Sequence, residues 1–164
     1  MSRETRFGWW TGSYVRPPAG MRGRTQIYEF TNDPHTPLTY HYPVDPNNRN
    51  RVLLLRPDTH FLTDLGSIPH RLQWWFPPDE FERAYLMHDS AYEDHGLWML
   101  CEGSWRFQAL RRIEIESLLR DMVRSEGCGE YRAWMIWKAV LWFGRSTWDD
   151  RSETSVDKAR KSTH

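Results

Sequence analysis

His88 and Asp89 bring two ionisable side chains into AYLMHDSAYEDHG, residues 84–96, a stretch with helical character. In a helix, Phe81, His88 and Tyr92 would share one apolar stripe, so His88 would face the interior. An imidazole with one nitrogen held by a carboxylate can take a proton from water with the other, which is general-base chemistry. The alternative is a hydrogen-bonded core histidine. Both interpretations require a partner for His88.

Glu116 is the candidate partner. The segment 105–124 repeats apolar residues at helical spacing, and Glu116 falls inside the resulting apolar face. An unpaired buried carboxylate is costly, so Glu116 should be paired. Arg112 lies one turn earlier on the same side, and His88 would be in reach if the two helices packed antiparallel. The sequence leaves both partners open.

Asp89 would project about 100° away from His88 around the helix axis. It could there bind a divalent cation together with carbonyl oxygens of the loop TDLGSIP, which carries Asp64 as a second acid. The alternative for Asp64 is that it caps a turn. Because the candidate ligands are oxygens, we predict Ca²⁺ or Mg²⁺ rather than Zn²⁺ if a metal binds.

Ten tryptophans among 164 residues suggest an aromatic core and an exposed aromatic patch that meets a partner or a lipid surface. The residues expected to contact substrate rim the same site: Ser67 in the loop, with Trp74 and Trp75 after it. Ser67, like Asp64, has the alternative of capping a turn.

The elements that position these residues indicate an α+β fold. Residues 1–24 are rich in Arg, Gly and Pro and predict an arm. Between 25 and 65 the runs TQIYEFT, LTYHY and RVLLLR predict a small, mostly antiparallel sheet. The single α+β domain should span 25–148 and pack this sheet on helices, and the polar tail 149–164 should be disordered.

Three helices are expected. The first covers about 79–94 and is closed by Gly96, the second covers about 105–124 with Ser104 as N-cap, and the third covers about 130–143.

Composition excludes several classes of protein. Lys plus Arg equals Asp plus Glu, 22 of each, so no nucleic-acid partner is expected. Cys101 and Cys128 lie outside any CxxC or zinc-finger pattern, which indicates reduced thiols. The sequence contains neither the apolar run of a signal peptide nor one long enough for a transmembrane helix, so a soluble protein is expected.

The runs RPDTHFLTDLGSIP, RAYLMHDSAYEDHG, IESLLRDMVRSEG and WKAVLWFGRSTW, between residues 51 and 148, resemble a family of tailed-phage and prophage proteins of unknown function. That family is marked by a TDxxSIP loop, an HDxxY helix, a later helix with an inward acid, and an AV-x-x-F-G ending. Glu116 stands where Asp is usual, and Gly66 where Ala is usual. The resemblance implies a place in the host cytoplasm or the virion, and another phage or host protein as partner.

The HDxxY element, His88, Asp89 and Tyr92, is similar to the catalytic helix of secretory phospholipases and of the phospholipase domain in parvovirus capsids. This similarity implies that His88 is the base, Asp89 holds calcium, Tyr92 buttresses the site, and Glu116 orients His88 from an antiparallel helix. Those enzymes have a glycine-rich calcium loop upstream, whereas TDLGSIP contains only Gly66.

Three hypotheses follow. The first is a metal-assisted hydrolase, with membrane phospholipid as the favoured substrate and a phosphodiester or cell-wall bond as alternatives. The second is a non-enzymatic phage component whose polar cluster locks helix register and whose tryptophans face another virion or host protein. The third is a helical metal phosphohydrolase with an HD dyad, but it needs further His ligands, and neither later helix contains one.

Overall fold

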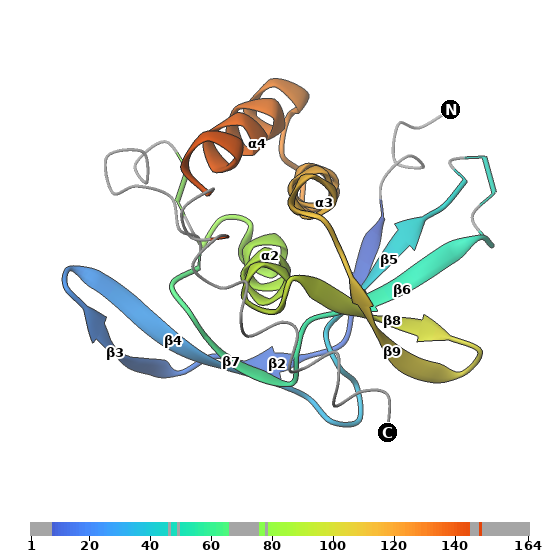
Figure 1. The fold of residues 1–164 in the computed structure, drawn as a ribbon, viewed down its shortest axis with the longest axis horizontal. Coiled ribbons are helices and arrows are strands. Elements are labelled where there is room, and N and C mark those ends of the chain that lie inside the picture. Colours follow the sequence, from blue (N-terminus) through green and yellow to red (C-terminus); the bar gives the residue numbers. More distant parts are fainter. Residues whose placement is uncertain are drawn as a thin grey trace.

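The computed structural model describes residues 8–45, 47–48, 50–65, 76–77, 79–144 and 148. It is an α+β fold in which a helical layer lies over antiparallel strands (Figure 1), as the sequence predicted. The strands are β1 (Trp9–Thr11), β2 (Tyr14–Val15), β3 (Pro18–Arg22), β4 (Thr25–Asn32), β5 (Thr39–Pro43), β6 (Val52–Arg56), β7 (His60–Thr63), β8 (Gly96–Cys101) and β9 (Ser104–Ala109). The expected disordered tail, 149–164, lies outside the described residues.

The strands form two sheets. One has the order β1-β5-β6-β8-β9, and every neighbouring pair in it is antiparallel. The other is built around β4, which pairs with β2 and β3 along one edge and with β7 along the other. The three predicted runs between residues 25 and 65 correspond to β4, β5 and β6.

The N-terminal segment differs from the expected arm, because residues 9–22 contribute β1, β2 and β3. Long-range contacts explain the difference. The Trp10 indole donates a hydrogen bond of 2.9 Å to the Ser125 hydroxyl. Arg16 donates two hydrogen bonds, of 2.5 and 2.6 Å, to the Glu82 carboxylate. The segment is therefore anchored by partners that its local sequence does not reveal.

The helices are α2 (Glu82–Asp94), α3 (Arg112–Ser125) and α4 (Glu130–Phe143). The first and third predicted helices are confirmed, although α2 starts later than expected. It is closed by His95, which adopts the left-handed conformation with φ 56°, while Gly96 already belongs to β8.

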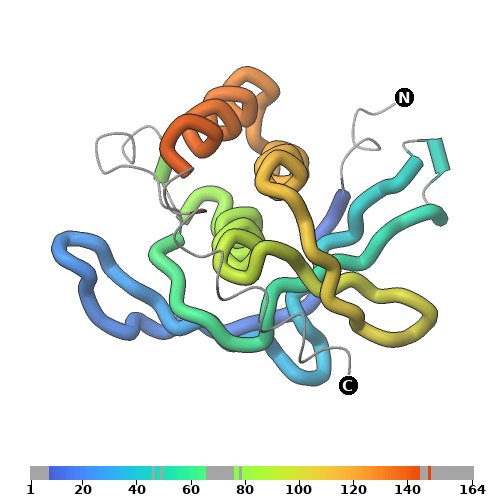
Figure 2. Tube along the Cα trace, in the orientation of Figure 1, coloured from blue at the N-terminus to red at the C-terminus, as the bar shows by residue number. Residues whose placement is uncertain are grey.

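The first part of the predicted second helix is wrong, because β8 and β9 form a hairpin there (Figure 2). Its two-residue turn is Glu102-Gly103, with φ of 51° and 79°. Positive φ at both positions is the geometry of a type I′ turn, which matches the twist of paired strands. Ser104 pairs with Cys101 across this turn instead of capping a helix. The helix begins only at Arg112, where the Arg111 N–H donates to Glu114 at 2.7 Å.

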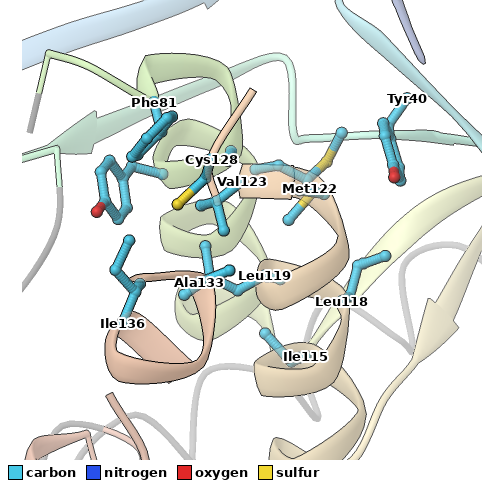
Figure 3. Packing of buried hydrophobic residues seen from close by; sticks show 14 of the residues in the cluster. Tyr40, Phe81, Ile115, Leu118, Leu119, Met122, Val123, Cys128, Ala133 and Ile136 are labelled. Atoms are coloured by element: carbon cyan, nitrogen blue, oxygen red, sulfur yellow. The ribbon is translucent and has the colours of Figure 1, made fainter. Parts of the chain in front are cut away.

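The core surrounds α2, in which 10 of 13 residues are buried. The larger cluster joins α2, α3 and α4 to the five-stranded sheet, and Figure 3 shows Leu119 and Val123 of α3 close to Ala133 of α4. A smaller cluster packs Leu86 on another side of α2 against Phe30 and Phe61 of the second sheet. Because α2 is enclosed on several sides, its polar residues need partners inside the protein.

No helix in the described part of the chain is both long and apolar enough to cross a membrane.

Candidate functional site

Helices α2 and α3 run antiparallel, the arrangement required to bring His88 to Glu116. Arg83 at the start of α2 contacts Glu126 past the end of α3 at 2.8 Å, and Tyr92 near the end of α2 contacts Glu116 near the start of α3. The β8–β9 hairpin, rather than a short loop, returns the chain between the two helices.

His88 and Glu116 face each other in the interior. His88 Nε2 lies 3.8 Å from Glu116 Oε2, and the two residues are 6% and 0% exposed. This separation exceeds a hydrogen bond by less than about 1 Å. Neither atom has a hydrogen-bond partner among the described residues. Two complementary buried atoms thus lie opposite each other, close to the expected geometry without reaching it.

The other oxygen of Glu116 accepts a hydrogen bond from the Tyr92 hydroxyl. Arg112 Nη1 lies 3.9 Å from the same oxygen, Oε1, and the Arg112 guanidinium also donates to the Leu141 carbonyl of α4 at 3.3 Å. Both of the candidates that the sequence left open therefore lie within 4 Å of Glu116, His88 at one oxygen and Arg112 at the other, although neither is hydrogen-bonded to it. Tyr92 thus contacts the carboxylate that faces His88, and its role as a buttress stays a prediction.

Asp89 lies on the opposite side of the His88 ring. Its Oδ1 is 3.9 Å from His88 Nδ1, and its Oδ2 accepts a hydrogen bond from the Thr63 hydroxyl at the end of β7. The Thr63 hydroxyl oxygen also accepts the Leu65 N–H at 2.9 Å, which turns the chain just after the half-buried Asp64. The start of the TDLGSIP loop is thereby tied to the carboxylate next to His88.

The electrostatics of the cluster favour a charged His88. Burial alone would lower the pKa of His88, but the hydrogen-bonding and charge contributions of Asp89 and Glu116 outweigh it and raise the pKa above its usual value. Burial and the Glu116 carboxylate raise the pKa of Tyr92, so its hydroxyl keeps its proton and donates a hydrogen bond to Glu116. The cluster would then be neutral overall, because the negative charges of Asp89 and Glu116 are matched by the His88 imidazolium and the Arg112 guanidinium.

Two further residues shape the site and were not among the predicted site residues. A Cβ added to Gly144, just after α4, would lie 2.5 Å from the Tyr92 hydroxyl oxygen. Trp148 stacks on His95 with ring centroids 3.8 Å apart and meets the Tyr92 ring edge-on at 5.2 Å. The AV-x-x-F-G signature contains Gly144, but its sequence alone does not indicate a contact with Tyr92.

The other predicted site residues are Asp64, Ser67, Trp74 and Trp75. Ser67, Trp74 and Trp75 lie outside the described residues. Asp64 and Asp89 are linked through Thr63, and the described part of the chain contains no group of three or more His, Cys, Asp or Glu side chains placed to hold a metal ion. The metal site stays a prediction.

Comparison with known proteins places this arrangement in a family. The chain has no significant match among curated proteins or among solved structures. Residues 41–140 match the family described as Protein of unknown function (DUF1353), a region that contains His88, Asp89, Tyr92 and Glu116. Because this match covers more than half of the 164 residues, the chain belongs to the DUF1353 family.

Proposed function

We propose that the chain is a phage-encoded hydrolase in which His88 is the general base and Glu116 orients it. The observation that carries the proposal is the pair of buried atoms, His88 Nε2 and Glu116 Oε2, which face each other at 3.8 Å without another hydrogen-bond partner among the described residues. A small closure would give the carboxylate–imidazole hydrogen bond that such a base requires.

In this mechanism the Nε2–H group of neutral His88 donates a hydrogen bond to Glu116 and keeps its proton. Nδ1 accepts a proton from water as the water oxygen attacks the scissile bond of the substrate, whose leaving group departs. The imidazolium that forms is stabilised by Glu116, whose negative charge is held in place by the Tyr92 hydroxyl and lies near Arg112. Because the pKa of His88 is raised, the fraction of neutral base should increase with pH over a range above the reference value of about 6.5.

Membrane phospholipid is the substrate that we favour. Its support is the similarity of His88, Asp89 and Tyr92 to phospholipase helices, together with an exposed aromatic surface on α4. The large apolar residues exposed there are Tyr131, Trp134, Trp142 and Phe143. Aromatic rings of this kind are suited to the boundary between water and lipid.

A divalent ion belongs to the proposal through Asp89, with Asp64 as the second acid. Asp89 has one oxygen engaged by Thr63 and the other directed toward His88. A calcium or magnesium site takes six or more oxygen ligands, so carbonyl oxygens and water would have to complete the coordination of an ion held by Asp89 and Asp64. The proposed proton transfer uses His88 and Glu116 alone, and the ion is tested separately.

A non-enzymatic role, as a phage structural or host-interaction protein, is the second candidate. The observation that favours it is the burial of Glu116 and His88, which leaves little of either side chain for water to reach. In that case the polar cluster fixes the register of α2 against α3, and the exposed aromatics of α4 meet another virion or host protein.

The test uses the purified full chain against phospholipid vesicles, nucleotide diesters and peptidoglycan, with and without calcium. His88→Asn should keep the fold and abolish turnover. His60→Asn is the matched control, because His60 lies on the surface and pairs only with Glu29 in the described part of the chain.

Three outcomes separate the candidates. Turnover that is lost in His88→Asn and kept in His60→Asn supports the hydrolase. No turnover on any of the three substrates, with normal growth of phage carrying His88→Asn, supports the structural role. Equal calcium binding by the wild type and Asp89→Asn in a calorimetric titration would remove the metal from the proposal.

A further inference from the structure

A cavity lies on α3, and neither His88 nor Glu116 lines it. It has a volume of about 340 Å³, which is at the small end of the range for small-molecule sites. One wall is the five-stranded sheet, whose β5 and β6 extend past α3 in Figure 1. The side chains of this wall are paired across neighbouring strands and come from Tyr42, Leu53, Leu55 and Met99.

The opposite wall is a stripe of α3 at helical spacing. It contains Ile113, Glu114, Ser117, Leu118 and Asp121, and Leu110 just before the helix completes the lining. Ile113 is 45% exposed although it is large and apolar, so the cavity reaches the surface there. An apolar pocket with a few polar groups and an open mouth is the usual form of a ligand site.

Asp121 is the unusual residue of this pocket. No hydrogen bond or ion pair from a described residue reaches its carboxylate, and its two basic neighbours are engaged elsewhere. The Arg120 guanidinium lies over the Trp137 ring at 5.7 Å, and Arg124 contacts Glu130 at 3.7 Å. Burial raises the pKa of Asp121 and outweighs the charges of Arg120 and Arg124, which lower it. Asp121 therefore lines the cavity as a partly buried acid whose carboxylate has no direct partner among the described residues.

The other polar groups of the lining are also suited to a positively charged ligand. Glu114 already contacts Arg111 at 3.2 Å, while the Tyr42 hydroxyl has no hydrogen bond within the described ranges. Tyr42 and Asp121 both line the cavity, and burial, followed by the charge of Asp121, raises the pKa of Tyr42. Burial also raises the pKa of Asp121. None of the ten residues that line the cavity carries a positive charge.

We propose that this cavity binds a small organic monocation, a protonated amine with an apolar body, whose ammonium group pairs with Asp121 while its body lies between β6 and α3. The apolar walls exclude water around the pair, which strengthens the interaction of the ammonium with the carboxylate. The Tyr42 hydroxyl supplies a second acceptor. This site is independent of the proposed base at His88.

The experiment compares three probes of equal length, hexylammonium, hexan-1-ol and hexanoate, by amide chemical-shift titration of the full chain at neutral pH. Hexylammonium should bind about tenfold or more tightly than hexan-1-ol, because a hydrogen bond to a charged group is worth more than a neutral one. Hexanoate should bind most weakly. The shifts should map to β6 and to the Asp121 face of α3.

Asp121→Asn keeps the shape of the side chain and removes its charge, so the preference for hexylammonium over hexan-1-ol should disappear while hexan-1-ol still binds. Glu102→Gln is the control, because Glu102 is an exposed acid at the tip of the β8–β9 hairpin. Leu53→Phe should weaken all probes by filling the cavity. No saturable shift at millimolar hexylammonium, shifts away from β6 and α3, or an unchanged preference in Asp121→Asn would each overturn the proposal.

Discussion

Gly144→Ala is the substitution whose effect the structure predicts most sharply. Gly144 has φ −79° and ψ −11°, backbone angles in the helical region that alanine commonly adopts. At such a position Gly→Ala ordinarily stabilises a protein by about 0.4–1 kcal/mol, because it restricts the unfolded chain. The contact with Tyr92 reverses this expectation here.

The new Cβ would lie 2.5 Å from the Tyr92 hydroxyl oxygen, 3.2 Å from its ring atom Cζ and 2.7 Å from the Val140 carbonyl oxygen, so part of the cost does not depend on Tyr92. An ordinary contact is about 3.5–4 Å, so the ring and Gly144 have to separate by about 1 Å. Overpacking of this kind costs about 1–3 kcal/mol. If Tyr92 also loses its hydrogen bond to Glu116, the free energy of unfolding can fall by a further amount of about 1.5–3 kcal/mol. We therefore expect Gly144→Ala to lower the free energy of unfolding by about 2–4 kcal/mol.

Urea denaturation of a double-mutant cycle with Tyr92→Phe measures this effect. Phenylalanine lacks the hydroxyl, so Gly144→Ala should cost clearly less in that background. Gly129→Ala is the matched control, because no atom lies within 4 Å of a Cβ added there. It should cost no more than the modest amount expected at a helix N-cap. A stabilised or unchanged Gly144→Ala variant, or the same cost with and without the Tyr92 hydroxyl, would refute the reasoning.

Two further outcomes are expected. Since the pKa of His88 is raised in the folded state, His88 should stabilise the protein fully below its unfolded pKa, about 6.5, and this contribution should be lost as pH rises through the folded pKa. The free energy of unfolding of the wild type minus that of His88→Asn should fall as the pH rises. A difference that stays constant between about pH 6 and 9 would contradict this expectation. Glu126→Gln should cost about 1–2 kcal/mol in urea at pH 7, because Glu126 accepts the Arg83 guanidinium N–H at 2.8 Å and the Ala84 backbone N–H at 3.2 Å. A loss below about 0.3 kcal/mol would show that neither bond contributes.

The inward placement of His88 and Glu116 could be predicted because it depends on local periodicity alone. Each residue falls within the apolar face of its own segment, and each is buried. Their antiparallel approach followed from the need of each buried group for a partner. The separation of 3.8 Å, in place of a hydrogen bond, depends on packing between helices and could not be read from either segment.

The β8–β9 hairpin shows where periodicity fails. Residues 96–109 contain too few positions to separate a strand from a helix, and several of their apolar residues fit both periods. The turn signal was Glu102-Gly103, which lies between two short apolar runs. The N-terminal strands could not be predicted for another reason. Trp10 and Arg16 are held by Ser125 and Glu82, which lie far along the chain.

The contacts also connect two sequence signatures that lie far apart along the chain. Gly144 ends the AV-x-x-F-G run, and its lack of a side chain leaves space for the Tyr92 hydroxyl of the HDxxY helix. Tyr92 donates to one oxygen of Glu116, whose other oxygen faces His88. These contacts form a route by which a substitution at Gly144 would displace Tyr92 and Glu116 and so alter the surroundings of the imidazole. If His88 is the base, Gly144→Ala should shift the pH dependence of turnover toward lower pH, because a displaced Tyr92 leaves Glu116 free to move away from the imidazolium that it stabilises. A purely structural cluster would show the loss of stability alone.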